Sequence, residues 1–428
     1  MCSIFGAFGK NVDINILSQL RKNAGDRGRD GGRMEGYVLE GGYQCYLGNW
    51  RATPTTELQN ARLQPYDGLV HNGTIANDKE LGGRDGEIDS EVLARVLDRT
   101  DFWSLKSSLE TVIGSYAIAC HNGKSVFLAC NYKPIYCWSP DRKTFYFSSM
   151  SRHFKNILPV GQEAFQIPPY LVVDLRLVVE NQFSWAEIPR RNAKRAVVIA
   201  SSGLDSTTVA WKLKSEGYEV HLLHFQYGCL AETREKDAVA RIAEALGATF
   251  TVIPIPYTQM AGKAAIMQND SENVVCDIQG AEYAHEWVPA RNLVMLSIAA
   301  AFSESSGYHI IALGSNLEES GAYPDNEEQF TYLFDKILDY AVQNGYELRL
   351  VTPVGNLMKH EIVKMGLELG VPYELTWSCY RNGERHCGTC GPCYMRQKAF
   401  QRNNKIDPVE YEIRLDPDSS EIGVAQYV

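Results

Sequence analysis

The strongest constraint on the fold is a change of hydrophobic pattern near Pro189. Up to about residue 185, short apolar stretches such as 36–40 and 170–175 alternate with turns, in the pattern of sheet proteins. From Ala196 onward, an apolar strand is followed by a helix, and this unit repeats. That alternation is typical of a parallel sheet with helices on both faces. The sequence therefore predicts two α/β domains of different architecture.

The domain boundary is predicted in the polar, basic stretch 189–195, which separates a domain at 1–187 from one at 195–428. A chain of 428 residues favours two domains, because single cores stop growing at roughly 250–300 residues. The second domain should be a doubly wound parallel sheet, with strands at 196–200, 219–225, 249–255 and 309–313 and helices at 207–216, 233–246 and 292–303. Helices are few in the first domain, at 15–23, 91–97 and 105–112.

No targeting or membrane segment is visible in the sequence. There is no run of 18 apolar residues, and the N-terminus lacks a basic segment followed by an apolar stretch, so we expect a cytoplasmic protein. The formal net charge of −10 repels phosphate backbones and weakens the case for a nucleic-acid substrate. Basic clusters keep that case open, at Arg190, Arg191, Lys194 and Arg195 and again between Arg381 and Arg402.

Cys2 is a candidate nucleophile. A small residue at position 2 allows removal of Met1, so that one residue carries both a thiol and a free amine, which can act as nucleophile and base. Alone, a cysteine at this position could be incidental. Five separated motifs accompany it along the chain, at 26–30, 48–53, 71–77, 89–92 and 133–136.

These motifs resemble the class II, N-terminal nucleophile (Ntn), glutamine amidotransferase domain of asparagine synthetases and glucosamine-6-phosphate synthases. The resemblance extends over roughly residues 2–185. It implies a four-layer αββα sandwich, in which the Cys2 thiol attacks the side-chain amide of glutamine. The ammonia released would then serve the second domain.

The same resemblance assigns roles to four further residues. Asn72 and the Gly73 N–H would form the oxyanion hole, although an Asn-Gly pair by itself is also typical of a turn. Arg51 would bind the α-carboxylate of glutamine through its planar guanidinium. Asp89 would bind the α-ammonium group.

A second candidate site follows the predicted strand 196–200, where Ser201-Ser202-Gly203-Leu204-Asp205-Ser206 leads into a helix. Small residues let backbone N–H groups approach a phosphate, and a helix N-terminus adds donors and a favourable dipole. The spacing is not that of a Walker loop. The loop instead resembles the S-G-G-x-D-S loop of ATP pyrophosphatases, except that Ser202 stands at the second position. In isolation, the Asp and Ser could equally cap an ordinary helix.

Four cysteines near the C-terminus have the spacing C-x7-C-x2-C-x2-C, and glycines between them allow tight turns. In a chain without an export signal, such a cluster indicates a metal site rather than disulfides. Four thiolates suit a tetrahedral, structural Zn²⁺, and an iron–sulfur cluster is the alternative. The predicted ligands are Cys379, Cys387, Cys390 and Cys393.

With the loop and the cysteines, the segments 288–292, 320–325 and 378–380 resemble 7-cyano-7-deazaguanine synthases over residues ~195–402. Members of that family adenylate 7-carboxy-7-deazaguanine with ATP and use ammonia twice, passing through an amide to a nitrile. The resemblance implies an ATP- and Mg²⁺-dependent site. Its residues would be Ser201, Ser202, Gly203, Asp205 and Ser206 for ATP, Arg291 and Asn292 lining the site, and Asp325 on the guanine edge.

Two positions depart from that family's pattern. After Gly228 this chain has Cys229-Leu230-Ala231 where the family usually carries Gln-Arg-His, and after Asp325 it has Asn326-Glu327 where the family tends to Cys-Arg. The substrate or the acceptor can therefore differ from the parent enzyme's. Outside the family context, Arg291 could form a surface ion pair and Asp325 could cap a turn.

Several functional interpretations follow. The leading one is a glutamine- and ATP-dependent ligase, acting as a homodimer, that converts the carboxylate to an amide or nitrile. A second transfers the same acyl-adenylate to a protein amine, as in antiphage defence. A third forms an amidine from a nitrile in tRNA or DNA, where adenylation is unnecessary. A fourth treats the first domain as an inactive scaffold, which would not need Cys2, Arg51, Asn72, Gly73 and Asp89 together.

Overall fold

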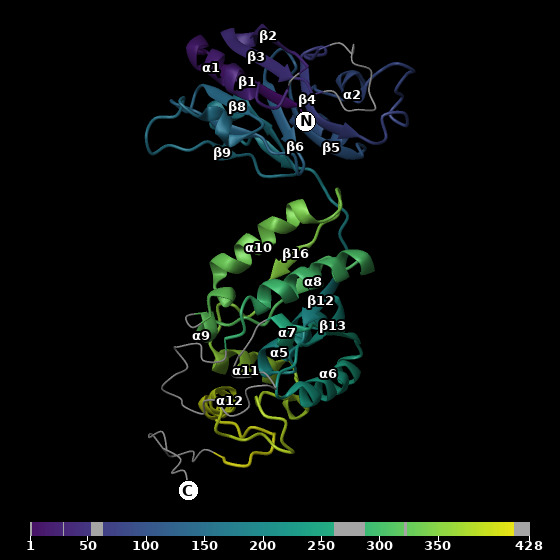
Figure 1. Cartoon of the computed structure of the whole chain (residues 1–428), viewed down its shortest axis with the longest axis vertical. Helices are drawn as coiled ribbons and strands as arrows, with labels where there is room; N and C mark the ends of the chain where they lie inside the picture. The colour runs from purple at the N-terminus through teal and green to yellow at the C-terminus, as the bar shows by residue number, and fades with distance from the viewer. Residues whose placement is uncertain (1, 29, 53–62, 261–286, 321–322, 415–428) are drawn as a thin grey trace. The chain divides into compact units, whose positions relative to one another are not determined.

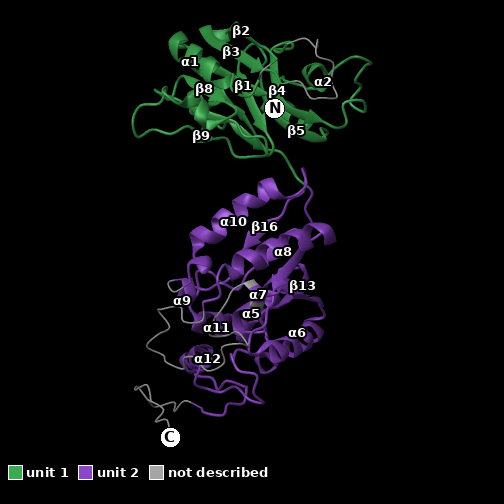
Figure 2. Ribbon diagram, viewed as in Figure 1, with its two compact units in different colours: residues 1–190 green, residues 191–428 purple. Residues whose placement is uncertain are grey.

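The computed structural model of the chain forms two compact units (Figures 1 and 2). Unit 1 comprises residues 1–190 and unit 2 comprises residues 191–428. Among the described residues, no helix is long and apolar enough to cross a membrane. The structure describes residues 2–28, 30–52, 63–260, 287–320 and 323–414.

The basic stretch near the division contacts protein groups within each unit. The Arg190 guanidinium lies over the Tyr170 ring of unit 1, 4.2 Å from the ring centroid. Arg191 extends the edge of the unit 2 sheet instead, because its carbonyl accepts a hydrogen bond of 3.1 Å from the Glu347 N–H. Two adjacent arginines thus belong to different units, and both have internal partners.

Unit 1 consists of four layers in the order helix, sheet, sheet, helix. One antiparallel sheet has the strand order β2-β3-β1-β8-β7-β9 and the other β11-β10-β6-β5-β4. This arrangement confirms the predicted αββα sandwich. The strands that carry the site are β1 (Ser3–Gly9), β3 (Tyr43–Trp50), β4 (Leu69–Ile75) and β5 (Gly114–His121), and the helices are α1 (Ile14–Ala24), α2 (Asp89–Val96), α3 (Phe102–Leu109) and α4 (Leu175–Val179). The other strands are β2 (Gly32–Leu39), β6 (Val126–Cys130), β7 (Tyr136–Trp138), β8 (Phe145–Ser148), β9 (Phe165–Gln166), β10 (Leu171–Asp174) and β11 (Trp185–Glu187).

The layers follow from the alternation of side chains along each strand. On β1, Ile4 and Phe8 belong to the core between the two sheets, together with Leu128 of the opposite sheet. The side chain of Phe5 lies on the other face of this sheet and packs with Leu17 of α1. A separate cluster joins α2 and α3 to the outer face of the second sheet. Every residue of β1 is therefore buried, which explains its continuous apolar sequence.

Unit 2 contains a parallel sheet with the strand order β14-β13-β12-β15-β16. The chain order along the sheet is thus reversed between β12 and β15, as in a doubly wound fold. Helices cover both faces, which confirms the predicted architecture. The strands are β12 (Arg195–Ile199), β13 (Glu219–Gln226), β14 (Thr249–Pro254), β15 (Ile310–Ala312) and β16 (Arg349–Val351). The helices are α5 (Leu204–Ser215), α6 (Glu232–Leu246), α7 (Tyr257–Met260), α8 (Arg291–Ser306), α9 (Leu317–Ser320), α10 (Glu328–Ala341), α11 (Lys359–Glu368) and α12 (Gly391–Arg402).

The central strand β12 shows why both faces need helices. Val198 packs with α5, α6 and α11 on one face, whereas Val197 packs with α8 and α10 on the other. Both side chains have no exposed surface. A strand that is buried on both faces has consecutive apolar residues in its sequence, as residues 196–200 do.

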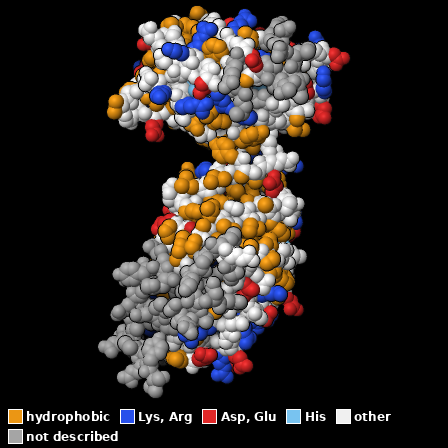
Figure 3. All heavy atoms as spheres, in the orientation of Figure 1, with side chains coloured by type: hydrophobic (Ala, Val, Ile, Leu, Met, Phe, Trp, Pro, Cys, Tyr) orange, Lys and Arg blue, Asp and Glu red, His pale blue; other side chains and the backbone are white. Residues whose placement is uncertain are grey.

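An apolar strip remains on the outer surface of α10. Leu333 and Ile337, one helical turn apart, have exposed fractions of 52% and 54%. Figure 3 shows hydrophobic side chains gathered on the part of unit 2 formed by α8 and α10. The predicted homodimer stays a prediction.

Candidate active sites and metal centre

In unit 1, the first strand places Cys2 beside Arg51. The antiparallel register pairs Ser3 with Trp50, so that Cys2 and Arg51 lie opposite one another at the end of the sheet. The Ala52 N–H donates to the Cys2 Sγ at 3.4 Å. Arg51 is almost fully buried. Two residues that are far apart in sequence and that the motif resemblance assigns to one site thus lie side by side.

Asn72 and Gly73 lie on β4, in the second sheet, and both belong to a tightly packed strand. The Asn49 side chain of β3 donates to the His71 carbonyl at 3.4 Å, which ties the two sheets together near the Cys2 end. A Cβ atom on Gly73 would lie 1.8 Å from the Ser115 carbonyl oxygen, so only glycine fits there. The Asn-Gly pair is therefore part of a strand and not a hairpin turn.

Asp89 joins this strand to α2. Its Oδ2 accepts from the Ile75 N–H at 2.9 Å, and its Oδ1 accepts from the Ser90 N–H at 2.6 Å. Oδ1 also accepts from the Ser90 hydroxyl at 3.2 Å, so Oδ2 is the oxygen with a lone pair left for a further donor among the described contacts. Binding of the glutamine ammonium by Asp89 stays a prediction. Arg29 and Thr53, which belong to the motifs, lie outside the described residues.

Arg27 is a neighbour of the thiol to which the motifs assigned no separate role. Burial and the nearby Arg152 lower the pKa of Arg27, whereas Asp26 and the Cys2 thiolate act in the opposite direction. The guanidinium therefore lies within electrostatic reach of the thiol.

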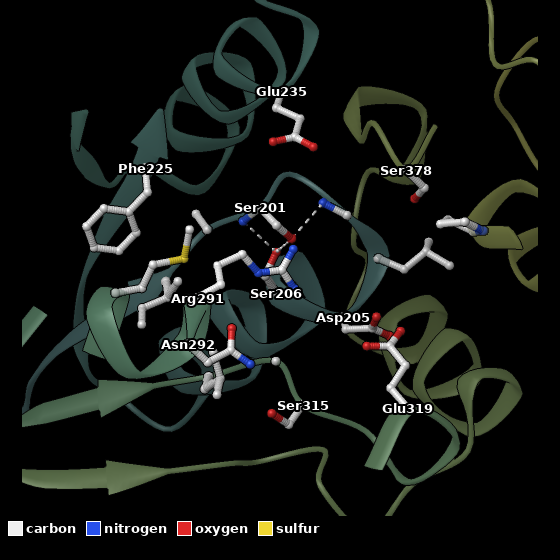
Figure 4. A pocket seen from close by; sticks show the side chains of 18 of the residues that line it. Ser201, Asp205, Ser206, Phe225, Glu235, Arg291, Asn292, Ser315, Glu319 and Ser378 are labelled. Atoms are coloured by element: carbon white, nitrogen blue, oxygen red, sulfur yellow. Dashed lines mark hydrogen bonds between the residues drawn. The ribbon is translucent and has the colours of Figure 1, made fainter. Parts of the chain in front are cut away.

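In unit 2, a cavity opens beyond the carboxyl ends of β12 and β15, where the strand order reverses (Figure 4). Open α/β sheets commonly bind ligands at this point. The Ser201–Ser206 loop follows β12, and Gly314 and Ser315 follow β15. Other lining residues come from distant segments: His224, Phe225, Tyr227, Glu235, Arg291, Asn292, Met295, Glu319, Asn326, Lys359, Trp377, Ser378, Tyr380 and Pro392.

The loop is held in a tight turn by its own hydroxyl groups. The Ser201 N–H donates to Ser206 Oγ at 3.3 Å, and the two hydroxyl oxygens are 3.2 Å apart. Gly203 is the N-cap of α5, which therefore starts three residues before the predicted position. Asp205 thus stands in the first helical turn, where its backbone N–H can face an anion.

Ser202, at the position that departs from the usual loop, has a left-handed backbone with φ of +65°. Its hydroxyl donates to the Trp377 carbonyl at 3.1 Å, and the Trp377 N–H donates back to its carbonyl at 3.0 Å. The Ser202 side chain is buried and is not part of the cavity lining, in contrast to Ser201 and Gly203. Any contact of Ser202 with ATP would therefore run through its backbone.

An ionic cluster lies beside the loop. The Lys359 ammonium contacts Asp205 Oδ2 at 2.8 Å and Glu319 Oε1 at 2.7 Å. Burial lowers the pKa of Lys359, but the two carboxylates more than offset it, and the pKa lies above its ordinary value. Burial raises the pKa of Asp205, and the lysine offsets only part of that rise. Asp205 Oδ1 is buried, and within the described residues it has no hydrogen-bond partner.

Arg291 and Asn292 begin α8 and face the cavity, as Figure 4 shows. The pKa of Arg291 is raised, because the nearby Tyr227 and other groups more than offset the effect of burial. Asp325 accepts from the Asn292 N–H at 3.2 Å, and so satisfies a free donor at the start of α8. Asp325 is absent from the described cavity lining, and its contact with a guanine edge stays a prediction. Gly321 and Ala322 lie outside the described residues.

The four cysteines form one buried cluster. Their Sγ atoms all lie within 4.8 Å of one another, and two pairs are 4.0 Å apart. Around a tetrahedral zinc with Zn–S bonds of about 2.3 Å, sulfur atoms are about 3.8 Å apart, so this geometry fits a metal ion. Backbone N–H groups of Thr389 and Cys390 donate to Cys387 Sγ at 3.4 and 3.3 Å. The neighbouring thiols and Thr389 lower the pKa of Cys387, which favours the metal-binding thiolate.

Comparisons with known proteins identify relatives of this chain. A family described as "Queuosine biosynthesis protein QueC" matches residues 195–404, which contain the loop and the cysteine cluster. The 7-cyano-7-deazaguanine synthase of Sulfolobus acidocaldarius is 41% identical over 401 residues, which cover 88% of this chain and 86% of the relative. The chain belongs to the 7-cyano-7-deazaguanine synthase family. It is accordingly an enzyme.

Other members of the 7-cyano-7-deazaguanine synthase family differ in length. The synthase of Saccharolobus solfataricus is 39% identical and is covered completely by an alignment that spans 96% of this chain. The synthase of Methanosphaerula palustris is 38% identical over 219 residues, which are 51% of this chain but 99% of the relative. Some synthases are therefore about as long as unit 2 alone, whereas others share nearly the whole two-unit chain.

Within this synthase-family domain, the cysteine cluster adjoins the cavity wall. Ser378 precedes Cys379, and Pro392 lies between Cys390 and Cys393. Both Ser378 and Pro392 line the cavity. Arg396, fully buried, pairs with Asp407 at 2.7 Å and donates to Ser378 Oγ at 3.3 Å. The cysteine cluster and this ion pair together hold the wall in place.

The sequence did not identify Glu235, Glu319 or Lys359 as site residues. They come from three separate elements, and no short spacing connects them with the loop. The only local signal for Lys359 is its position at the start of a helix, two residues before Glu361, whose carboxylate accepts from the Met358 N–H. That signal predicts a helix start and not a functional lysine.

Proposed function

We propose that this enzyme is a glutamine- and ATP-dependent amidating ligase. Unit 2 adenylates a carboxylate of the 7-carboxy-7-deazaguanine type and forms an amide or nitrile with ammonia that unit 1 releases from glutamine. One observation carries the proposal. The Ser201–Ser206 loop and the Lys359 cluster meet in one cavity at the switch point of a domain that belongs to the synthase family.

In the proposed first step, a substrate carboxylate oxygen attacks the α-phosphorus of ATP and pyrophosphate leaves. The loop N–H groups and the α5 N-terminus bind the departing phosphates, which carry the growing negative charge. The Lys359 ammonium lies at the same edge of the cavity and adds a positive charge. Mg²⁺ bound with ATP supplies charge neutralisation, and the buried Asp205 carboxylate fits it through its unpartnered Oδ1.

The nucleoside and the carboxylate substrate occupy the remaining walls. Phe225 and Met295 provide apolar surface for a planar base, and both line the cavity. The Arg291 guanidinium projects toward the loop and suits a substrate carboxylate or the oxyanion that forms later (Figure 4). A carboxylate needs this activation because its charge is delocalised and its oxygen is a poor leaving group.

In unit 1, we propose that the Cys2 thiolate attacks the glutamine amide. The free amine of an N-terminal cysteine takes up the proton of the thiol. Asn72 and the Gly73 N–H stabilise the tetrahedral oxyanion, while Arg51 and Asp89 bind the amino-acid end of glutamine. Arg51 lies opposite Cys2, which suits a substrate of the length of one glutamine.

For the metal centre, we propose a structural Zn²⁺ held by Cys379, Cys387, Cys390 and Cys393. A closed set of four thiolates leaves no position for a substrate, so the ion cross-links the chain. It does no chemistry in the reaction. Its effect on the site is to fix the turns that carry Ser378 and Pro392.

The proposal is tested by supplying ATP with 7-carboxy-7-deazaguanine and separating the nucleotide products. We expect AMP and pyrophosphate, and a loss of both in Asp205→Asn. The exposed Asp237→Asn serves as the matched control and should behave as the unmodified enzyme. Release of ADP and phosphate would contradict the proposal. AMP without a small amide or nitrile would favour a protein amine as acceptor, and amidine formation from a nitrile without ATP would favour the nucleic-acid alternative.

A further inference from the structure

Glu235 is a cavity residue that the proposed adenylation does not use. It lies in the first turn of α6, and its carboxylate points into the cavity above the loop that contains Ser201 (Figure 4). Ser378, from the segment that leads into the cysteine cluster, also lines the cavity. Glu235 therefore faces the space in which a substrate bound to the loop would present its activated carbonyl group.

The groups around Glu235 come from three elements. The Cys229 thiol, in the turn after β13, donates to Glu235 Oε2 at 3.7 Å. Arg291 of α8 and Glu232 of α6 act on the carboxylate through space. The Arg291 guanidinium also lies over the Tyr227 ring, 5.9 Å from the ring centroid. Burial raises the pKa of Glu235 to about 7, although Arg291 and the Cys229 hydrogen bond act in the opposite direction.

We propose that Glu235 is the general base that removes a proton from the attacking nitrogen when ammonia reacts with the acyl-adenylate, and that Cys229 is a positioning residue for its carboxylate. This inference rests on the proposed function and adds a catalytic residue to it. It also gives a role to Cys229, which stands where the family usually carries glutamine.

When ammonia attacks the acyl-adenylate, the nitrogen lone pair forms the C–N bond, and the carbonyl π electrons move onto oxygen. Glu235 takes one N–H proton from the resulting ammonium. The oxyanion electrons then re-form the C=O bond, the bond between the acyl carbon and the phosphate oxygen breaks, and AMP leaves with that electron pair. The products are the amide, AMP and protonated Glu235, which returns its proton to water.

The other candidate bases in the cavity are less suited. Asp205 and Glu319 both contact the Lys359 ammonium, so that protonating either one would weaken an ion pair. His224 donates through Nδ1 to the Ala200 carbonyl at 2.8 Å, and its Nε2 has no partner within the described residues. Burial lowers the pKa of His224, which makes it a weaker proton acceptor near neutral pH. A base with a pKa near the working pH, as for Glu235, is the most effective.

The test separates formation of the acyl-adenylate (activation) from its reaction with ammonia to give the amide (capture). Carboxylate-dependent exchange of labelled pyrophosphate into ATP reports adenylation, and amide formation with ammonium salts reports capture. In Glu235→Gln we expect exchange to persist while amide formation falls by about 10²- to 10⁴-fold, the usual contribution of a general base. Glu235→Asp should recover part of the rate. Asp237→Asn, on the exposed side of the same helix, should change neither.

Two further readouts distinguish a base from a structural residue. With rates expressed against free ammonia, the unmodified enzyme should lose activity as pH falls below about 7, because Glu235 becomes protonated, and Glu235→Gln should lose this dependence. Hydroxylamine forms an intermediate that gives up its proton more easily, so it should reduce the defect of Glu235→Gln. Cys229→Ala should shift the apparent pKa of this loss of activity but should not abolish the loss.

The outcomes are distinct from those of the proposed function. If the unmodified enzyme shows no exchange, the adenylation proposal itself fails. If Glu235→Gln loses exchange and capture equally, Glu235 serves substrate binding and the inference is overturned. The inference is also overturned if amide formation from ammonia is unchanged in Glu235→Gln. The same holds if that variant still loses activity as the pH falls below about 7.

Discussion

The two units hold their reactive groups in different ways. In unit 1, the groups assigned to the glutaminase lie on or next to paired strands, and the neighbouring backbone positions them, as Ala52 does for the Cys2 thiol. In unit 2, the cavity collects side chains from Ile199 to Pro392, which come from loops, strand ends and the N-terminal parts of helices. A cysteine cluster and a buried ion pair hold one of its walls.

This difference suggests where each unit is vulnerable. In the proposed function, unit 1 depends on one thiol, and its product, ammonia, can be supplied from solution. Unit 2 would depend on cross-links whose loss removes the cavity itself. Changes in unit 1 should therefore affect one nitrogen source, whereas changes in unit 2 should affect folding or all turnover.

The largest effect is expected from Cys390→Ser, which removes one of the four ligands. A structural zinc contributes on the order of 10 kcal/mol to folding, comparable to the stability of a whole domain. We expect loss of the metal and unfolding of unit 2, with unit 1 still resistant to limited proteolysis. Elemental analysis should find one zinc per chain in the unmodified protein and in Cys2→Ala. A folded, metal-free Cys390→Ser, or iron in the unmodified protein, would refute the zinc proposal.

The next largest effect is expected from Cys2→Ala. Glutamine-dependent turnover should fall by about 10⁴-fold, because no other group replaces the nucleophile. Turnover with ammonium salts should stay within about twofold of the unmodified enzyme, since the thiol takes no part in unit 2 chemistry. Steady-state rates with the two nitrogen sources provide the measurement. Equal losses with both sources would show that the units do not act as independent sites.

A smaller effect, on stability, is expected from Asp407→Asn. The change leaves the fully buried Arg396 guanidinium without its carboxylate, which costs about 3–5 kcal/mol in comparable buried pairs. Urea unfolding should show the loss in the transition of unit 2 only. Glu410→Gln is the matched control, because it removes an exposed ion pair with Arg385 and should change stability by less than about 0.5 kcal/mol. Similar losses for both variants would contradict the role given to the buried pair.

The smallest of the four effects is expected from Lys359→Met. It removes the cation shared by Asp205 and Glu319 and should slow adenylation by about 10²-fold, or about 2.7 kcal/mol of transition-state stabilisation. Carboxylate-dependent AMP formation gives the rate. Lys364→Met, on the exposed face of the same helix, should be nearly neutral. Unchanged AMP formation in Lys359→Met would remove the ionic cluster from the mechanism.

Much of the fold could be predicted from local patterns. The alternation in unit 1 and the strand–helix repeat in unit 2 each reflect a buried face, which hydrophobic periodicity records directly. The cysteine cluster was equally accessible, because its ligands lie within a short segment. The start of α5 was placed three residues late, since the sequence does not show that Gly203 serves as the N-cap. α10, α11 and α12 were not predicted as elements.

The site was only partly accessible to sequence reasoning. The motifs identified Arg51 and Cys2, and strand pairing then brought them opposite one another. Lys359 and Glu319 meet Asp205 through tertiary packing alone, and no sequence spacing encodes that contact. Glu235 was missed for the same reason, because a glutamate in the first turn of a helix is also a common capping feature.

The proposed function requires unit 2 to activate a carboxylate as its acyl-adenylate. The most direct measurement uses 7-carboxy-7-deazaguanine labelled with ¹⁸O in the carboxylate, together with ATP and ammonium salts, and mass spectrometry of the AMP formed. Attack by a carboxylate oxygen on the α-phosphorus followed by cleavage at the acyl carbon predicts one ¹⁸O atom in each AMP phosphate. AMP without the label, or ADP in its place, would contradict the account.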